Sequence, residues 1–381
     1  MSSLFKKAIT VNLYCFLVIS AFMPYAVFNK FFFIILLTLF AIYFSRNKMQ
    51  ASGAFLSPIL FVCLHIIYAL VALFYSDFSQ YTIQFTLSSF LILLVYPVVM
   101  FRINVEKIIV FAGVLIALAV IFFSILFLAL NLDLGMPIFN VLDLAIGYRD
   151  FGIYEVPMVQ LSATPVLFVA YGLSSLHWLN NRSVYSLLAS CVILFAGLVS
   201  GQRGVFLLIL LSFSIFLISS SRESKFFKVI IILMLISCLY FSIGLLSELF
   251  SSSDFSNSIK SGHINSYFQN VDLVRFLFGQ GLGSSYYTEG YERIASVTEI
   301  TILDSVRYFG IFSFALLWGL ILNPLIIIGK LGCNIGARFW IFLGYIVLST
   351  TNPVLFNSFG MFILVWFWSL FFNDKKTWVT Q

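Results

Sequence analysis

Long apolar tracts separated by short polar connections run along the whole chain. Because a helix needs about 20 mainly apolar residues to cross a bilayer, each tract predicts a transmembrane helix. The pattern therefore predicts an all-α polytopic membrane protein, one integral membrane domain over residues 1–381. About twelve spans are expected, at residues 9–28, 31–45, 54–75, 80–101, 108–131, 158–178, 184–200, 204–219, 229–248, 300–328, 338–350 and 354–372.

Composition agrees with this pattern. Hydrophobic residues make up 61% of the chain and charged residues 9%, against roughly 25% charged residues in a typical soluble domain. The net charge of +6 comes from basic residues that lie singly, which argues against a nucleic-acid partner. The five cysteines have no metal-ligand spacing and are interpreted as small apolar residues, so we predict neither a metal nor a cofactor.

The positions of Lys and Arg predict the orientation in the membrane. Basic residues favour the cytoplasmic side, and most of the 21 fall there if the N-terminus is inside. Both termini are therefore expected in the cytoplasm, with the first span an uncleaved signal anchor. Most acidic residues then lie on the outer side.

Two outer segments are long enough to carry function. Residues 132–157 lie between spans five and six and contain Arg149, and residues 249–297 form the largest hydrophilic piece, between spans nine and ten. A loop of that length without an apolar period is rarely an idle connection. A tight hairpin between spans seven and eight also leaves Arg203 on the outer side.

The stretch "VTEITILDSVRYFG" places Glu299, Asp304 and Arg307 at the mouth of the tenth span. A structural explanation is a capping box from Ser296 to Glu299, with Asp304 and Arg307 paired at i and i+3. A functional explanation is that ionisable groups at membrane depth mark a substrate path. The sequence leaves both open.

The run "FGQGLGSS" has the spacing G-x-G-x-G and is neither a dinucleotide fingerprint nor a P-loop. A glycine-rich turn can let backbone amides approach a phosphate or a sugar, which makes Gly281 and Gly283 candidates. The tyrosines that follow, Tyr286, Tyr287 and Tyr291, can stack on sugars. His263 upstream is a lone loop histidine, a type that is usually solvated.

One carboxylate with several outer arginines fits glycosyl transfer from a lipid diphosphate. The carboxylate takes the proton of an acceptor hydroxyl, and guanidinium groups hold the departing diphosphate where other enzymes use a metal. The arginines expected on that side are Arg149, Arg203, Arg275, Arg293 and Arg307. Snorkelling to lipid headgroups explains Arg293 as well.

Taken in order, these pieces resemble the bacterial O-antigen polymerase (Wzy) family and the related O-antigen ligases. The elements are the hairpin Ser200–Gly204, the glycine run Gly279–Gly283, and Glu299 followed by Gly310, so the resemblance covers about the C-terminal half. Ligases typically have His at the Glu299 position, which favours a polymerase. The R-x10-G pattern of some polymerases is not found after Arg149, Arg275 or Arg293.

The resemblance implies a GT-C-like membrane fold and metal-independent transfer of a growing glycan from undecaprenyl diphosphate to a lipid-linked repeat unit. It also implies the bacterial inner membrane, an active site facing the periplasm, and a chain-length regulator of the Wzz type as partner. Glu299 and Asp304 become the candidate catalytic residues. The candidate substrate and diphosphate ligands are Arg149, Arg203, His263, Arg275, Gly281, Gly283 and Arg307.

Two alternatives remain. An O-antigen ligase shares the chemistry and differs in the acceptor. A flippase or transporter shares the span count, but such carriers usually show a repeat between their halves and charges at the midplane. Here the two halves do not resemble each other, and the charges gather at the outer ends of the spans.

Overall fold

The computed structural model describes residues 2–23, 28–47, 56–75, 77–130, 144–150, 155–202, 204–205, 209, 229, 233, 255–331, 336–350 and 352–372. The chain folds as two compact units. The first unit comprises residues 1–108, 260–334 and 349–381, and the second comprises residues 109–259 and 335–348.

Apolar helices dominate the described residues. Five segments are long and apolar enough to cross a bilayer: Ser3–Phe22, Leu56–Phe74, Gln80–Phe101, Val105–Leu128 and Thr301–Pro324. Four further apolar helices are shorter: Asn29–Tyr43, Val184–Val199, Ala337–Thr350 and Ser358–Leu370. The chain is therefore a mainly α-helical, multipass membrane protein, as the hydropathy pattern predicts. The number of spans and the GT-C arrangement stay predictions, and the predicted spans 204–219 and 229–248 lie almost wholly outside the described residues.

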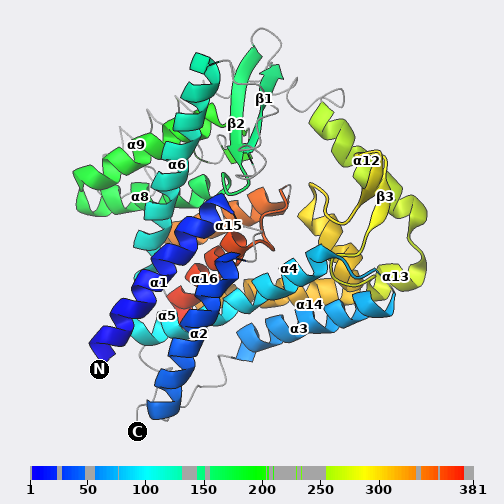
Figure 1. Cartoon of the computed structure of the whole chain (residues 1–381), viewed down its shortest axis with the longest axis horizontal. Helices are drawn as coiled ribbons and strands as arrows, with labels where there is room; N and C mark the ends of the chain where they lie inside the picture. The colour runs from blue at the N-terminus through cyan, green and yellow to red at the C-terminus, as the bar shows by residue number, and fades with distance from the viewer. Residues whose placement is uncertain are drawn as a thin grey trace. The chain divides into compact units, whose positions relative to one another are not determined.

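The first unit contains most of these helices (Figure 1). Its elements are α1 (Ser2–Phe22), α2 (Phe28–Asn47), α3 (Leu56–Phe74), α4 (Gln80–Ser89), the 3₁₀ turn η2 (Phe90–Leu94), α5 (Val95–Phe101), α13 (Leu273–Phe278), β3 (Tyr286–Thr288), β4 (Arg293–Ala295), α14 (Thr301–Leu331) and α16 (Ser358–Phe372). Helix α12 (Phe255–Asn270) belongs to this unit from Lys260 onward.

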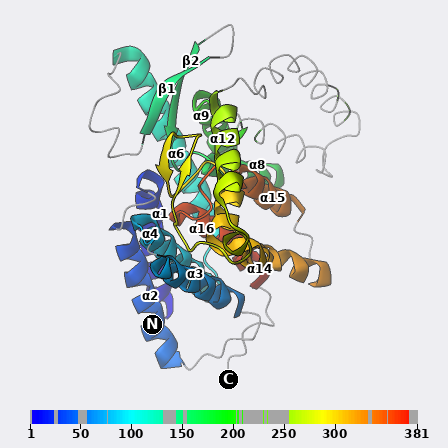
Figure 2. The same cartoon turned by 90° about the vertical axis from the view of Figure 1, so that its right-hand side faces the viewer.

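The centre of the first unit is α16. Its side chains are buried all the way from Ser358 to Ser369, the mark of a helix enclosed by others. It packs against η2, α5 and α14. Helices α3, α4 and α14 run side by side next to it (Figure 1, Figure 2).

The predicted span 80–101 is present as the apolar segment Gln80–Phe101, with a 3₁₀ turn in its middle. Helix α4 passes into the 3₁₀ turn η2 and then into α5. Pro97 has no amide hydrogen for the carbonyl of Leu93 and its ring would crowd that carbonyl, so an unbroken α-helix is unfavourable here.

The second unit holds α6 (Val105–Leu130, from residue 109), the strands β1 (Leu144–Asp150) and β2 (Glu155–Leu161), and the helices α8 (Val166–Asn181), α9 (Val184–Val199) and α15 (Gly336–Thr350). Strands β1 and β2 pair antiparallel along their full length. The predicted span 158–178 therefore begins too early, because residues up to Leu161 belong to this hairpin and the helix starts after Pro165. The apolar run Val156–Val159 in this strand cannot be told from the start of a span by hydropathy alone.

Candidate active site

The predicted loop 249–297 has regular structure in its described part. Helix α12 leads to the short α13, and the glycine run then connects α13 to the hairpin β3–β4 (Figure 1). The β3–β4 hairpin and α12 stand at one end of α3, α4 and α14 (Figure 1). His263, expected in a solvated loop, lies on α12 and is fully buried.

The glycine run crosses α14 where that helix is broken. Gly310 has a φ of 66°, a left-handed conformation that interrupts the helix. A helix broken there leaves carbonyls of the preceding turn without their usual donors. The amide of Gln280 donates to Arg307 O at 2.8 Å and that of Gly281 donates to Tyr308 O at 3.1 Å. A Cβ on Gly279 would lie 2.5 Å from Tyr308 O, so the crossing requires glycine.

The same run is bonded to the neighbouring helices. The amide of Leu282 donates to Tyr68 O on α3 at 2.9 Å, and the hydroxyl of Thr82 on α4 donates to Leu282 O at 2.7 Å. Gly281 and Gly283 are buried against the backbones of Ala72 and Thr82. The structure thus gives both glycines a packing role, and their predicted contact with phosphate or sugar stays a prediction.

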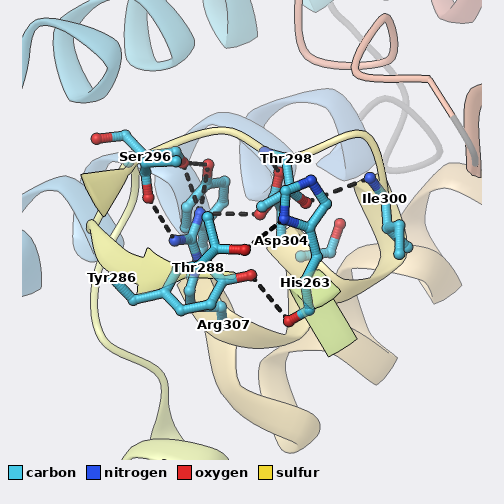
Figure 3. Close-up of polar contacts among 12 residues, drawn as sticks. His263, Tyr286, Thr288, Ser296, Thr298, Ile300, Asp304 and Arg307 are labelled. Atoms are coloured by element: carbon cyan, nitrogen blue, oxygen red, sulfur yellow. Dashed lines mark hydrogen bonds and ion pairs between the residues drawn. The ribbon is translucent and has the colours of Figure 1, made fainter. Parts of the chain in front are cut away.

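Arg307 fastens the hairpin to α14 (Figure 3). Its side chain is fully buried, and its guanidinium donates to Ala295 O at 3.1 Å and to Ser296 O at 2.5 Å. The guanidinium also lies over the ring of Tyr286 on β3, 4.6 Å from its centroid. Arg307 therefore contacts both strands of the hairpin, and its predicted contact with substrate stays a prediction.

Asp304 completes this clamp from the same helix face. Its Oδ1 accepts from Arg307 Nη2 at 2.8 Å, and its Oδ2 accepts from the amide of Thr298 at 2.8 Å. The ion pair between Asp304 and Arg307 that their i, i+3 spacing suggests is confirmed. Because the carboxylate is buried and both oxygens are engaged, it is poorly placed to receive a proton from an acceptor.

Glu299 lies in the segment between β4 and α14. The capping-box prediction is wrong, since α14 begins at Thr301 and Glu299 precedes its first turn. The Glu299 side chain is 32% exposed, and its Oε2 lies 3.9 Å from Lys260 Nζ on α12. Of the two predicted catalytic carboxylates, Glu299 is the accessible one.

His263 lies behind the hairpin. Its Nδ1 is 2.5 Å from the hydroxyl of Thr288, and its ring centroid is 4.4 Å from that of Tyr291. Its Nε2 is buried without a hydrogen-bond partner in the described residues. Burial, and then the charge of Arg307, lower the pKa of His263 to about 4, so the imidazole is neutral at pH 7.

The predicted arginines are distributed over both units. Arg275 on α13 is about half exposed, pairs with Asp272 at 3.2 Å and lies over the ring of Tyr75. Arg149 is on β1, opposite Val156 in the register. Arg203 lies outside the described residues. Arg293 is exposed on β4.

Sequence reasoning missed three contributors to this region. Lys260 was not singled out, although it stands one helical turn before His263 in "KSGHINSY". Tyr286 was interpreted as a sugar-stacking residue, but its ring lies against Arg307. Tyr308 adjoins the clamp as well, donating to Ser296 O. Among the described residues, no three His, Cys, Asp or Glu side chains gather as a metal site would require.

Comparison with known proteins shows a similarity to a bacterial polymerase. The chain is 31% identical over 173 residues to an O-antigen polymerase of Shigella flexneri. The matched region is 45% of this chain and 43% of the relative, so it spans less than half of the relative's length. No family model matches the chain, and no solved structure matches it. The resemblance to O-antigen polymerases inferred from the sequence motifs is confirmed by this similarity.

Proposed function

We propose that this protein is a polysaccharide polymerase of the bacterial inner membrane. It transfers a growing glycan from undecaprenyl diphosphate to a hydroxyl of a new lipid-linked repeat unit at the periplasmic face. The observation that carries the proposal is the placement of Glu299: a partly exposed carboxylate at the mouth of an apolar span, on a segment fixed by a buried ion pair. The similarity to an O-antigen polymerase supports the same reaction class.

In this reaction Glu299 is the general base. It accepts the proton of the acceptor hydroxyl as that oxygen forms a bond to the anomeric carbon of the donor. The bond from that carbon to the diphosphate oxygen breaks, and the diphosphate leaves with the electron pair. Arg275 is exposed enough to meet this anion, and Arg149 and Arg203 keep the diphosphate-binding role proposed from the sequence.

Asp304 and Arg307 have a different role in this proposal. They hold Ala295, Ser296 and Thr298 in place and so fix the backbone that carries Glu299. Catalysis depends on such pre-set geometry, because a base must lie within hydrogen-bond reach of the proton it removes. A chain-length regulator of the Wzz type is the proposed partner.

The test is an assay with purified protein and synthetic undecaprenyl diphosphate repeat unit in EDTA. Wild-type protein should produce a ladder of lipid-linked oligomers, and Glu299→Gln should lower the rate by about 10²-fold or more. Ladders of full length from Glu299→Gln would remove Glu299 as the base. Transfer to lipid A core without a ladder would indicate a ligase, and movement of the unit across proteoliposomes without transfer would indicate a flippase.

A further inference from the structure

An apolar groove lies between α3 and the end of α13. It has a volume of about 490 Å³, within the range of roughly 300–1,000 Å³ usual for ligand sites. One wall is a stripe on α3 with helical spacing, Ile67, Leu70 and Phe74. The other wall is Phe278 with Gly279. The larger side chains of both walls are more than half exposed, so the groove opens outward.

A cation marks one end of this groove. Tyr75 lines the groove at the end of α3, and the guanidinium of Arg275 lies 5.7 Å from its ring centroid. Arg275 pairs with Asp272 through Nε and with no other carboxylate in the described residues. An apolar groove with a half-exposed guanidinium at its end fits a ligand that has a hydrocarbon tail and an anionic head.

The groove and the candidate active site share the glycine run. Gly279 is the first residue of the glycine run, and its backbone crosses α14 at Gly310, three residues beyond Arg307. From Gly279 the chain passes through Leu282 to the hairpin that Arg307 clamps. The glycine run that forms one wall of the groove therefore also supports the hairpin that precedes Glu299.

We propose that this groove binds the polyprenyl chain of a diphosphate-linked carrier, with Arg275 on its diphosphate. The inference rests on the proposed function and adds the binding place of the carrier. It assigns the exposed apolar face of α3 from Ile67 to Phe74 to substrate rather than to bilayer lipid alone.

The experiment is photolabelling of the full-length protein in lipid nanodiscs with a diazirine-bearing polyprenyl diphosphate. Labelled peptides should contain residues 67–75 or 273–279. Leu70→Trp, which fills the groove from an exposed position, and Arg275→Gln should each lower labelling about tenfold. Leu60→Trp is the matched control, because Leu60 is similarly exposed on α3 but lies outside the groove, and it should leave labelling unchanged.

Two results would overturn the proposal. One is labelling spread over the apolar helices and unchanged by Leu70→Trp. The other is equal labelling of the groove by a diazirine phosphatidylglycerol, with excess phosphatidylglycerol displacing the polyprenyl probe. The readout needs no turnover, so a labelled groove in a protein that makes no ladder would refute the proposed reaction alone. A ladder from a protein with an unlabelled groove would refute the groove alone.

Discussion

The two hairpins among the residues that the structure describes are stabilised in different ways. Strands β1 and β2 each have 7 residues and pair along their length, and β2 buries Val159 and Leu161. Strands β3 and β4 have 3 residues each, too few for an independent ladder. The short hairpin is instead bonded to Arg307, which donates to the carbonyl of Ala295 at the end of β4 and to that of Ser296 just after it. The segment carrying Glu299 is therefore positioned by a buried polar clamp and not by its own pairing.

The largest effect on stability is expected from breaking the clamp formed by Asp304 and Arg307. Arg307→Met leaves the Asp304 carboxylate buried without its cation and frees two carbonyls, which should cost about 3–5 kcal/mol of stability. Hydrogen exchange of amides 286–299 measures the effect, and the amides of the β1–β2 hairpin serve as the control. Unchanged protection of 286–299 would show that the clamp does not hold the short hairpin.

A second comparison uses two glycines with nearly the same φ. Gly310 has a φ of 66° and Gly201 in the second unit has a φ of 65°, so an Ala at either position is strained in its backbone. A Cβ on Gly310 meets backbone atoms of Leu277 and Phe278 at 2.5 Å, whereas one on Gly201 meets the flexible Met158 side chain at 2.7 Å.

Gly310→Ala should therefore destabilise the protein more than Gly201→Ala, by a further ~2 kcal/mol or more. Thermal unfolding of the two purified variants in the same detergent gives the comparison. Equal thermal unfolding midpoints would mean that the glycine run is not closely packed against α14.

A smaller effect on stability is expected from lowering the pH. The imidazole of His263 faces the charge of Arg307 and the neutral rings of Tyr286 and Tyr291, whose pKa values burial raises to about 12. Its own pKa is lowered to about 4, below the ordinary value near 6.5, so the unfolded state takes up the proton first.

The stability that the neutral imidazole provides is thus complete above pH 6.5 and is lost as pH falls toward 4. Protection of amides 286–299 should decline over that interval in the wild type. His263→Gln, which carries no titrating group, should flatten the decline. An unaltered pH profile in the variant would assign the loss to other groups.

The smallest effect is expected from the exposed ion pair. Lys260 and Glu299 are 3.9 Å apart and about one-third exposed, so Lys260→Met should change stability by less than about 1 kcal/mol. The buried pair of Asp304 and Arg307, at 2.8 Å, is the internal comparison. A loss from Lys260→Met as large as that from Arg307→Met would contradict the distinction between the two pairs.

The sequence predicts the helical elements well where one pattern dominates. Long apolar tracts locate α3, α6 and α14, because twenty apolar residues admit few other structures in a membrane protein. The short strands were missed, since three-residue β3 and β4 have no periodicity to detect. Their contact with Arg307 joins β3 to a later helix, so no short-range pattern shows it.

The sequence predicts which residues belong to the candidate site better than it predicts the role of each. Spacing alone identified Asp304 with Arg307 as a pair, because residues three apart share a helix face. It could not show that both are buried, or that His263 lies under the hairpin, because burial follows from tertiary packing. The glycine run was singled out because it lets backbone amides approach a phosphate or a sugar, whereas its close backbone crossings depend on partners in α3 and α14.

The central claim is that Glu299 acts chemically while Asp304 and Arg307 hold it in place. The most direct measurement is the rate of lipid-linked oligomer formation per folded molecule, for Glu299→Gln and Asp304→Asn side by side with thermal unfolding of each. The account predicts a Glu299→Gln protein with wild-type stability and no ladder, and an Asp304→Asn protein with lowered stability that still forms oligomers. A stable Asp304→Asn protein without activity, or an active Glu299→Gln protein, would contradict it.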